Sequence, residues 1–429
     1  MRITAQRTRW APPGVTIRAL PAAGHDFEVA ALVLGGVLVL GALTSGLARR
    51  SFLSLSAISV LAGFVLGGGA TGVLHFNPRS AFVADLATVA LVVLLFRDGL
   101  EVEAEMLQTQ WHLPLRKLVL AMPLTAAIVA VGTHLLTNLS WTECFLLGAL
   151  LSPTDPVLSS GVVTNPRVPR LVRHSLNLES GMNDGLALPA VLALSAALAS
   201  GSSHFVWWRF VLENVTVGLA AGLLMGLLAA WIMPRAKGLG EGIPSHQRAL
   251  FAVGTAFATY GIALVPPHGN GLIAVFVASI TLGIRRPEIR SYFQRHAEDI
   301  VEIVKVGVFV VFGSLLTLHG LFADGWAAVG IVAVTLLLAR PVAVFAALIG
   351  TTTDTATRAF MSWFGPKGVA TITFSLLVLS QRIASGTRIF NLAALVVFCS
   401  IIAHGVTDTA GAEWIARRAE RGGQPAPGQ

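Results

Sequence analysis

The sequence predicts an all-α polytopic membrane protein with about 13 transmembrane helices, built from two inverted repeats whose broken helices cross at the midplane of the bilayer. Composition is the first reason: of 429 residues, 54% are hydrophobic and 12% are charged, whereas soluble domains carry roughly 25% charged residues. The second reason is a series of long apolar runs separated by short polar connections. The third is that proline interrupts two of these runs, at comparable positions in the two halves of the chain.

The apolar runs are long enough to cross a bilayer. A spanning helix needs about 20 mostly apolar residues to cross ~30 Å of hydrocarbon. The candidate spans are 27–48, 53–70, 80–99, 113–136, 141–164, 175–200, 211–233, 247–266, 269–284, 300–319, 325–349, 358–380 and 388–410. Residues 1–26 form an N-terminal extension that lacks the apolar core and cleavage signal of a signal peptide.

Basic residues indicate the orientation of the chain. Lys and Arg gather in the tail 411–429 and in the connections after odd-numbered spans, among which we count Arg97 and Lys117. The positive-inside rule then places these connections and the C terminus in the cytoplasm, and the N terminus outside. The formal charge of +8 is therefore a topology signal rather than a nucleic-acid-binding face. The expected location is the plasma (inner) membrane.

The fifth span contains the first interruption, Ser-Pro-Thr-Asp-Pro at 152–156. Two prolines three residues apart remove two helical donors, so the helix is expected to break. Freed backbone is tolerated at membrane depth only where protein or a water-filled cavity satisfies it, which favours a binding site. A simple proline kink is the alternative, but a kink does not require Thr154 and Asp155 inside the break.

The second interruption is Gly-Pro-Lys-Gly at 365–368 in the twelfth span. Each break falls in the fifth span of its six-helix half, and the odd span between the halves inverts the second half relative to the first. This pattern indicates an inverted-repeat transporter with crossing half-helices. Asp155 is then expected near positive helix N-termini, and Lys367 near negative C-termini.

The sixth span carries four polar side chains in an apolar segment. At 100° per residue, Glu179 and Asn183 share one face of the helix, Ser180 and Asp184 share another, and the two carboxylates lie roughly 140° apart. Ionisable groups inside membrane spans mark ion or proton pathways by default. We therefore expect Asp184 to meet the broken helix at a cation site and Glu179 to pair with Arg340. A buried polar network that only packs helices is the alternative.

Other charged side chains have simpler interpretations. Lys305 and Glu302 are expected to form a pair three residues apart at the membrane edge. Asp85 and His404 are expected to be satisfied by neighbouring backbone groups. A solvated cytoplasmic face is expected for the acidic cluster of Asp98, Glu101, Glu103 and Glu105.

These residues resemble those of the NhaP-type sodium/proton antiporters of the monovalent cation:proton antiporter-1 family. The resemblance covers roughly residues 30–410 and is carried by five strings: Phe96-Arg-Asp-Gly-Leu100, Ser152-Pro-Thr-Asp-Pro156, Glu179-Ser-x-x-Asn-Asp-Gly185, Ala339-Arg-Pro341 and Gly365-Pro-Lys-Gly-Val369. It implies a homodimer of 13-helix protomers, each with a core domain that moves against a dimerisation domain. Gly181 and Met182 depart from the bulkier pairs of relatives, and the short tail implies no large cytoplasmic regulatory domain.

The resemblance also implies roles for single residues. Asp184 would be the carboxylate that binds the cation and accepts the proton. The other implied ligands of Na+ are the side chains of Glu179 and Ser180 and the backbone of Thr154. The residues implied to shape the site are Asn183 and Asp155, and those implied to compensate charge are Arg340, which would pair with Glu179, and Lys367.

The same resemblance divides the chain into domains. The expected segments are an N-terminal extension (1–26), the dimerisation domain (27–99 and 247–319), the core ion-transport domain (113–200 and 325–410), a linker helix (211–233) and a short cytoplasmic tail (411–429).

The expected function is secondary antiport of Na+, or of Li+ or K+, against protons by alternating access, with both ions competing for Asp184. Because Asn183 stands where some relatives have a second aspartate, one proton should exchange for one cation, without net charge movement. A K+/H+ antiporter of the same fold is one alternative. A cation channel is another, but the sequence has no repeated filter of backbone carbonyls. No enzymatic motif and no cofactor are expected; the expected partners are cations, protons, lipid and a second copy of the chain.

Overall fold

The computed structural model describes residues 32, 34–39, 55–102, 112–155, 162, 165–200, 205–233, 244–266, 268–351, 353–381 and 383–421, and these ranges are helical with no strand. The helices are α2 (Leu55–Leu66), α3 (Ala81–Leu100), α5 (His112–Arg116), α6 (Met122–Leu136), α7 (Trp141–Leu151), α9 (Arg170–Ala199), α10 (Trp207–Phe210), α11 (Val217–Ile232), α12 (Ser245–Ala263), α13 (Gly271–Arg285), α14 (Glu288–His296), α15 (Glu298–Ser314), α16 (Leu318–Leu321), α17 (Trp326–Ala333), α18 (Arg340–Ala347), α19 (Thr355–Trp363), α20 (Val369–Ser380) and α21 (Gly386–Arg421). Three π-helical turns join some of them: η1 (Lys117–Ala121), η3 (Val211–Thr216) and η4 (Val334–Ala339).

The helices agree with the predicted membrane spans. Every span from 53–70 onward overlaps a helix or a pair of helices, while most of 27–48 lies outside the described residues. In the described part of the chain, 5 continuous helices are long and apolar enough to cross a membrane: His112–Leu136, Arg170–Ala199, Trp207–Ile232, Trp326–Ala347 and Gly386–Arg418. The sequence prediction missed α14, which is too short and too polar to register as a span and packs through Ile289 and Phe293.

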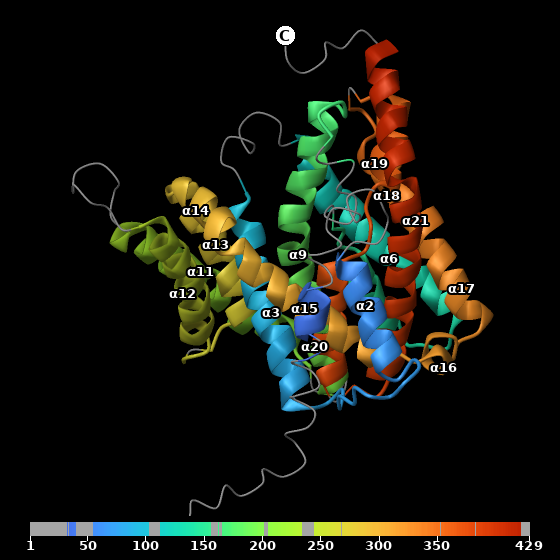
Figure 1. Ribbon diagram of the computed structural model, residues 1–429, viewed down its shortest axis with the longest axis horizontal. Coiled ribbons are helices and arrows are strands. Elements are labelled where there is room, and N and C mark those ends of the chain that lie inside the picture. Colours follow the sequence, from blue (N-terminus) through green and yellow to red (C-terminus); the bar gives the residue numbers. More distant parts are fainter. Residues whose placement is uncertain are drawn as a thin grey trace, which may run out of the picture.

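Helices α11–α14 lie to the left of α9, and α6, α16–α19 and α21 lie to its right (Figure 1). Helices α2 and α15 pack on each other near the centre of the view. In the left group, α13 packs on α11 and on α3. In the other, α6 contacts α7 and η4, α18 contacts α19, and α20 contacts α21. Helix α3 bridges the groups because it also packs on α9 and α20. Residues on α3 and α9 therefore meet where the two groups join.

Glycine allows the close packing of α11 on α13. Gly218, Gly222 and Gly226 recur every four residues along α11, and a Cβ at Gly222 would lie 2.4 Å from the carbonyl oxygen of Ala274. The large apolar side chains elsewhere on this helix are exposed, with Trp231 80% exposed. Such a surface suits contact with lipid, which is as apolar as leucine.

The two interrupted helices lie side by side. Helix α7 ends at Leu151 before the break, and the second break separates α19 from α20. The backbone N–H of Asp155 donates to the carbonyl of Pro366 at 2.8 Å, joining one break directly to the other. The hydroxyl of Thr371 donates to the carbonyl of Leu150 at 2.9 Å. The two breaks thus meet as predicted, while most of 156–164, the second half of the first broken helix, lies outside the described residues.

Candidate ion-binding site

Opposite charges occupy the ends of the broken helices. The amide of Val369, the first residue of α20, donates to Oδ2 of Asp155 at 3.3 Å. The ammonium of Lys367 donates to the carbonyls of Ser152 at 3.4 Å and Pro153 at 3.2 Å, just beyond α7. Asp155 therefore lies at a positive N-terminus, and Lys367, 1% exposed, lies at a negative C-terminus. This is the arrangement that the sequence predicts.

Glycine is required where the two breaks touch. A Cβ at Gly368 would lie 2.5 Å from both Cβ and Oδ2 of Asp155, closer than side chains can approach. We expect Gly368→Ala to displace the carboxylate and to cost about 1–3 kcal/mol of stability, as overpacking does. The measurement is the melting temperature of the purified variant. Gly307→Ala is the matched control, because a Cβ there meets nothing within 4 Å. Equal melting temperatures for the two variants would contradict this account of the crossing.

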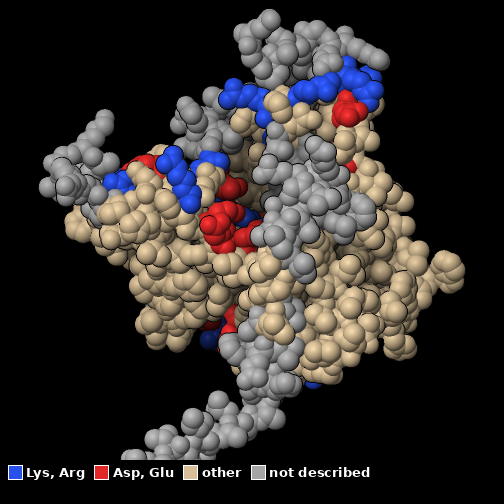
Figure 2. All heavy atoms as spheres, viewed as in Figure 1, with Lys and Arg blue, Asp and Glu red and all other residues tan. Residues whose placement is uncertain are grey.

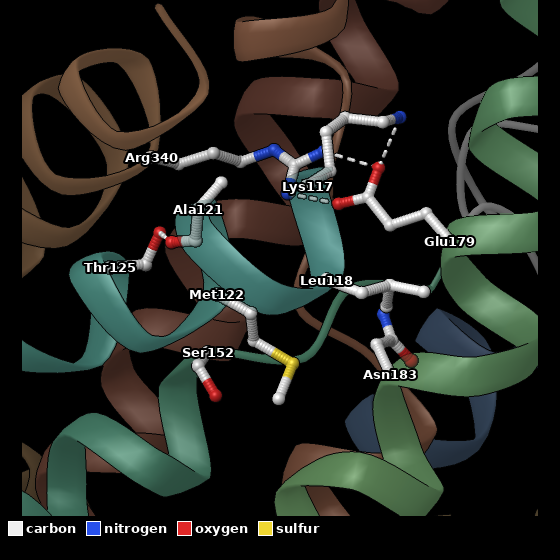
Figure 3. A pocket seen from close by; sticks show the side chains of 9 residues that line it. All are labelled: Lys117, Leu118, Ala121, Met122, Thr125, Ser152, Glu179, Asn183 and Arg340. Carbon is white, nitrogen blue, oxygen red and sulfur yellow. Dashed lines mark hydrogen bonds and ion pairs between the residues drawn. The ribbon is translucent and has the colours of Figure 1, made fainter. Parts of the chain in front are cut away.

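Glu179 is held by two cations rather than one (Figure 3). Arg340 donates from Nη1 to Oε1 at 2.8 Å and from Nη2 to Oε2 at 3.3 Å. Lys117 donates from Nζ to Oε2 at 2.7 Å and to the carbonyl of Ser175 at 3.1 Å. All three charged side chains are buried. The contact between Arg340 and Glu179 was expected, but the placement of Lys117 in a connection was wrong.

Lys117 and Arg340 both adjoin π-helical turns. Lys117 is the first residue of η1, and Arg340 directly follows η4. A π-helical turn inserts an extra residue and re-aims the side chains around it, and such turns recur at functional sites. The guanidinium of Arg340 also fills the space beside Gly365, where a Cβ would lie 2.0 Å from Nε. The second break thus provides room for the cation that reaches Glu179.

A small polar pocket separates Glu179 from the break in α7. Its polar lining includes Lys117, Ser152, Glu179, Asn183 and Arg340 (Figure 3). The amide of Asn183 donates to the carbonyl of Thr154 at 2.7 Å and to its hydroxyl at 3.1 Å. Within the described residues Asn183 Oδ1 has no hydrogen-bond partner. Asn183 therefore ties α9 to the broken backbone.

Asp184 lies on a different face of α9 from this pocket, on the side of Asp98, a residue that the sequence did not indicate as part of the site. The charges of Asp98 and Asp155 both act on the carboxylate of Asp184. Asp98 is 5% exposed at the last turn of α3, so its predicted solvated position was wrong. Glycine permits this approach, because a Cβ at Gly181 of α9 would lie only 3.3 Å from the carbonyl oxygen of Asp98.

Asp98 forms an ion pair with the neighbouring residue Arg97. Arg97 donates to Oδ1 of Asp98 from Nε at 2.8 Å, and Nη2 lies 2.7 Å from the same oxygen. Acidic side chains gather in the hollow between the α14 side of the molecule and the centre (Figure 2). In the described ranges, no three His, Cys, Asp or Glu side chains are arranged to hold a metal ion. Arg97 thus compensates the charge of one of the two carboxylates that act on Asp184.

The remaining predicted residues have the following positions. Ser180 is partly buried on the Asp184 side of α9. Lys305 pairs with Glu302 at 2.5 Å, as predicted. The two ring nitrogens of His404 lie 2.8 Å from backbone carbonyl oxygens, Nδ1 from that of Ser400 and Nε2 from that of Trp363, so the expected backbone partners are confirmed. Asp85 is exposed, Glu101 is partly buried at the end of α3, and Glu103 and Glu105 lie outside the described residues.

The structure contains two interrupted helices whose breaks meet, with compensating charges at the helix ends. These features are typical of membrane transporters built from inverted repeats. The family model for "Sodium/hydrogen exchanger, transmembrane" matches residues 36–412, and the chain belongs to this family. The fold class and the family predicted from the sequence are thus confirmed.

Known relatives agree with this membership. The chain is 24% identical to the K(+)/H(+) antiporter NhaP of Alkalimonas amylolytica over 389 residues, which cover 90% of this chain and 66% of that protein. It is also 24% identical to the K(+)/H(+) antiporter NhaP2 of Shewanella sp. (strain ANA-3) over 387 residues, with the same coverage of 90% and 66%. The chain therefore spans 66% of the length of these curated relatives.

A solved structure shares the fold. The sodium proton antiporter MjNhaP1 from Methanocaldococcus jannaschii at pH 8 superposes with a TM-score of 0.76 at 19% identity, covering 92% of this chain and 99% of that chain.

Proposed function

We propose that this protein is a secondary antiporter that exchanges a monovalent cation for a proton, with both ions competing for Asp184. One observation carries the proposal: within the described residues Asp184 forms no ion pair, and two of its charged neighbours, Asp98 and Asp155, are carboxylates, while the third, Arg97, is already paired with Asp98. A carboxylate in that position needs a positive partner, and a proton or a cation can supply one. Each ion excludes the other, which couples their movements.

The other site residues act in distinct ways in this proposal. Asp98, the hydroxyl of Ser180 and the backbone of Thr154 supply further oxygens near Asp184. Such oxygen ligands suit Na+ and K+, which are hard cations. Glu179 positions α9 instead of touching the cation, because Arg340 and Lys117 already hold both of its oxygens. This position differs from the direct Na+ ligand that the resemblance implies.

The breaks themselves position the site. Asp155 and Lys367 compensate the helix ends, and Asn183 fixes the distance between α9 and the carbonyl of Thr154. Since these contacts join α7, α9 and α20, the crossing can move as one unit. Alternating access then consists of a movement of the core domain (113–200 and 325–410) against the dimerisation domain (27–99 and 247–319).

The proposed assembly and location follow from the same family. We propose a homodimer in the plasma (inner) membrane, with the N terminus outside and the C terminus in the cytoplasm. The basic residues of the tail helix support this orientation, since Arg417 and Arg418 lie near its C-terminal end.

The choice of cation has two candidates. Na+ is supported by MjNhaP1, which is described as a sodium proton antiporter. K+ is supported by the NhaP and NhaP2 relatives, which are described as K(+)/H(+) antiporters. Both cations use the same oxygen ligands, so the mechanism is common to them.

Proton movement in vesicles tests the proposal. The purified protein is placed in proteoliposomes with an acidic interior and a pH-sensitive dye, and Na+, Li+, K+ or choline is added outside. We expect the interior to become alkaline with Na+ or K+ and to be unaffected by choline. No response to any of the three metal cations would contradict the proposal. Cation uptake without proton movement would support a channel instead.

A further inference from the structure

Arg97 lies between two carboxylates from different helices. Its Nε and Nη2 bind Oδ1 of Asp98 at 2.8 and 2.7 Å. Its Nη1 lies 3.6 Å from Oε1 of Glu298, the first residue of α15. The first contact is a hydrogen-bonded ion pair, whereas the second exceeds hydrogen-bond length. Arg97 therefore occupies Asp98 and has Glu298 within reach.

Glu298 has a carboxylate oxygen that could accept a further hydrogen bond. Its Oε2 is buried and has no hydrogen-bond partner within the described part of the chain. A buried carboxylate oxygen without a donor is costly, so the arginine would gain a charge-assisted hydrogen bond by moving toward it. The Arg97 side chain is 13% exposed, whereas that of Glu298 is 41% exposed, so the second position lies closer to solvent.

The surroundings of Arg97 make it a competitor for the cation site. The negative charges that act on it are Asp98, Glu101, Glu298 and Asp155. Asp98 in turn lies against α9, where a Cβ at Gly181 would be 3.3 Å from the carbonyl oxygen of Asp98, and its charge acts on Asp184 of the same helix. A cation bound between Asp98 and Asp184 would repel the guanidinium from Asp98. The carboxylate of Asp98 therefore binds either Arg97 or the cation more weakly when both are present.

We propose that Arg97 is a tethered cation that competes with the transported cation for Asp98. In the empty site Arg97 binds Asp98; when a cation binds, Arg97 moves to Glu298. The inference rests on the proposed antiport function and adds a residue that sets the affinity of the site. Arg97 acts through Asp98 and is a positioning residue.

The competition has a measurable size. If the binding-competent site is populated only when Arg97 has left Asp98, the apparent dissociation constant rises by the inverse of that fraction. A site that is free about one tenth of the time would bind the cation about tenfold more weakly than a site without the arginine. Such an internal competitor would keep the resting site neutralised and speed cation release.

Three variants test the competition in proteoliposomes, with KM for Na+ read from initial rates of proton movement at fixed pH. Arg97→Gln should lower KM by about tenfold, because the competitor is gone. Glu298→Gln should raise KM, because the alternative position of the arginine is weakened. The double variant should have the KM of Arg97→Gln, because Glu298 acts only through Arg97. Arg97→Lys keeps the charge and should stay near the wild-type value.

The outcomes separate competition from simpler explanations. Arg97 and Glu298 could instead act only through their electrostatic fields, without any movement of the arginine. Glu298→Gln would then shift KM by the same factor in the wild type and in Arg97→Gln, and this result would overturn the inference. If Arg97 only holds the fold, Arg97→Gln will leave KM unchanged or raised, with the same consequence. Should Arg97→Gln fail to assemble, Glu298→Gln is compared with Glu302→Gln one turn further along α15. A KM raised only in Glu298→Gln supports the inference, and a KM that is unchanged or raised equally in both variants overturns it. Absence of exchange in the wild type would instead contradict the proposed function itself.

Discussion

Asp184→Asn is expected to abolish cation-dependent proton movement while leaving the protein folded. The amide has nearly the volume of the carboxyl group but cannot release a proton or offer a full negative charge to a cation. We expect the rate in proteoliposomes to fall to that of empty vesicles, with a melting temperature close to the wild-type value. Removal of one charge from a cluster of like charges is not expected to unfold the protein, since Asp98 and Asp155 lie nearby.

Asp85→Asn is the matched control for this variant. It makes the same chemical change on α3, but at an exposed position. We expect exchange at the wild-type rate. Sustained cation-dependent proton flux in Asp184→Asn would disprove the assignment of Asp184.

The second large effect concerns stability, at the buried cluster of Glu179, Arg340 and Lys117. Breaking a buried ion pair by removing one partner costs about 3–5 kcal/mol, because the other charge is left uncompensated. Glu179→Ala should be the more damaging change, since it leaves two buried cations without their carboxylate. Arg340→Ala should cost less, because Lys117 still neutralises Glu179 at 2.7 Å.

A double-mutant cycle measures this coupling. The melting temperatures of Glu179→Ala, Arg340→Ala and the double variant are compared with the wild type. We expect the double variant to lose less than the sum of the single losses, because the two side chains share two hydrogen bonds. Strictly additive losses would mean that the pair contributes no direct interaction. The same change at the exposed pair of Arg417 and Glu413, Arg417→Ala, should have little effect, since exposed pairs contribute about 0–1 kcal/mol.

The sequence predicted those parts of the site that depend on order along the chain. The prolines indicate the two breaks, and the hydropathy of the sequence indicates the spans around them. The inverted arrangement of the halves then places Asp155 and Lys367 at opposite helix ends. Arg340 was paired with Glu179 because it lies deep in an apolar run with no acidic residue in its own helix. Each of these inferences uses a local signal and a general rule of helix electrostatics.

The sequence could not predict contacts that depend on which helix faces meet. Lys117 and Asp98 lie at the ends of apolar runs. Hydropathy alone assigns charged residues at such positions to the aqueous connections. The structure turns both inward, Lys117 beside a π-helical turn and Asp98 beside Gly181 of α9. The signal that was available in the sequence is Gly181, because the absence of a side chain there allows α3 to approach α9. Helix-to-helix packing decides the rest.

The stoichiometry of exchange depends on how these charges are compensated. Within the described residues, Asp98 is paired with Arg97, Glu179 with Arg340 and Lys117, and Asp155 with the N-terminus of α20. In the proposed mechanism Asp184 is then expected to be the single group that exchanges a proton for a cation. Asp184 is neutral with either a proton or a monovalent cation bound, so the cycle should move no net charge.

The most direct test is the steady-state Na+ distribution across proteoliposomes at a fixed pH gradient and several clamped potentials. Valinomycin and graded K+ ratios set the potential, and a parallel assay checks whether K+ alone drives proton movement. We expect the same final Na+ ratio at every potential. A cycle that moves one net charge per Na+ would instead shift that ratio by about fiftyfold per 100 mV, since each charge contributes about 2.3 kcal/mol per 100 mV. A Na+ ratio that follows the imposed potential would contradict one-for-one exchange at Asp184.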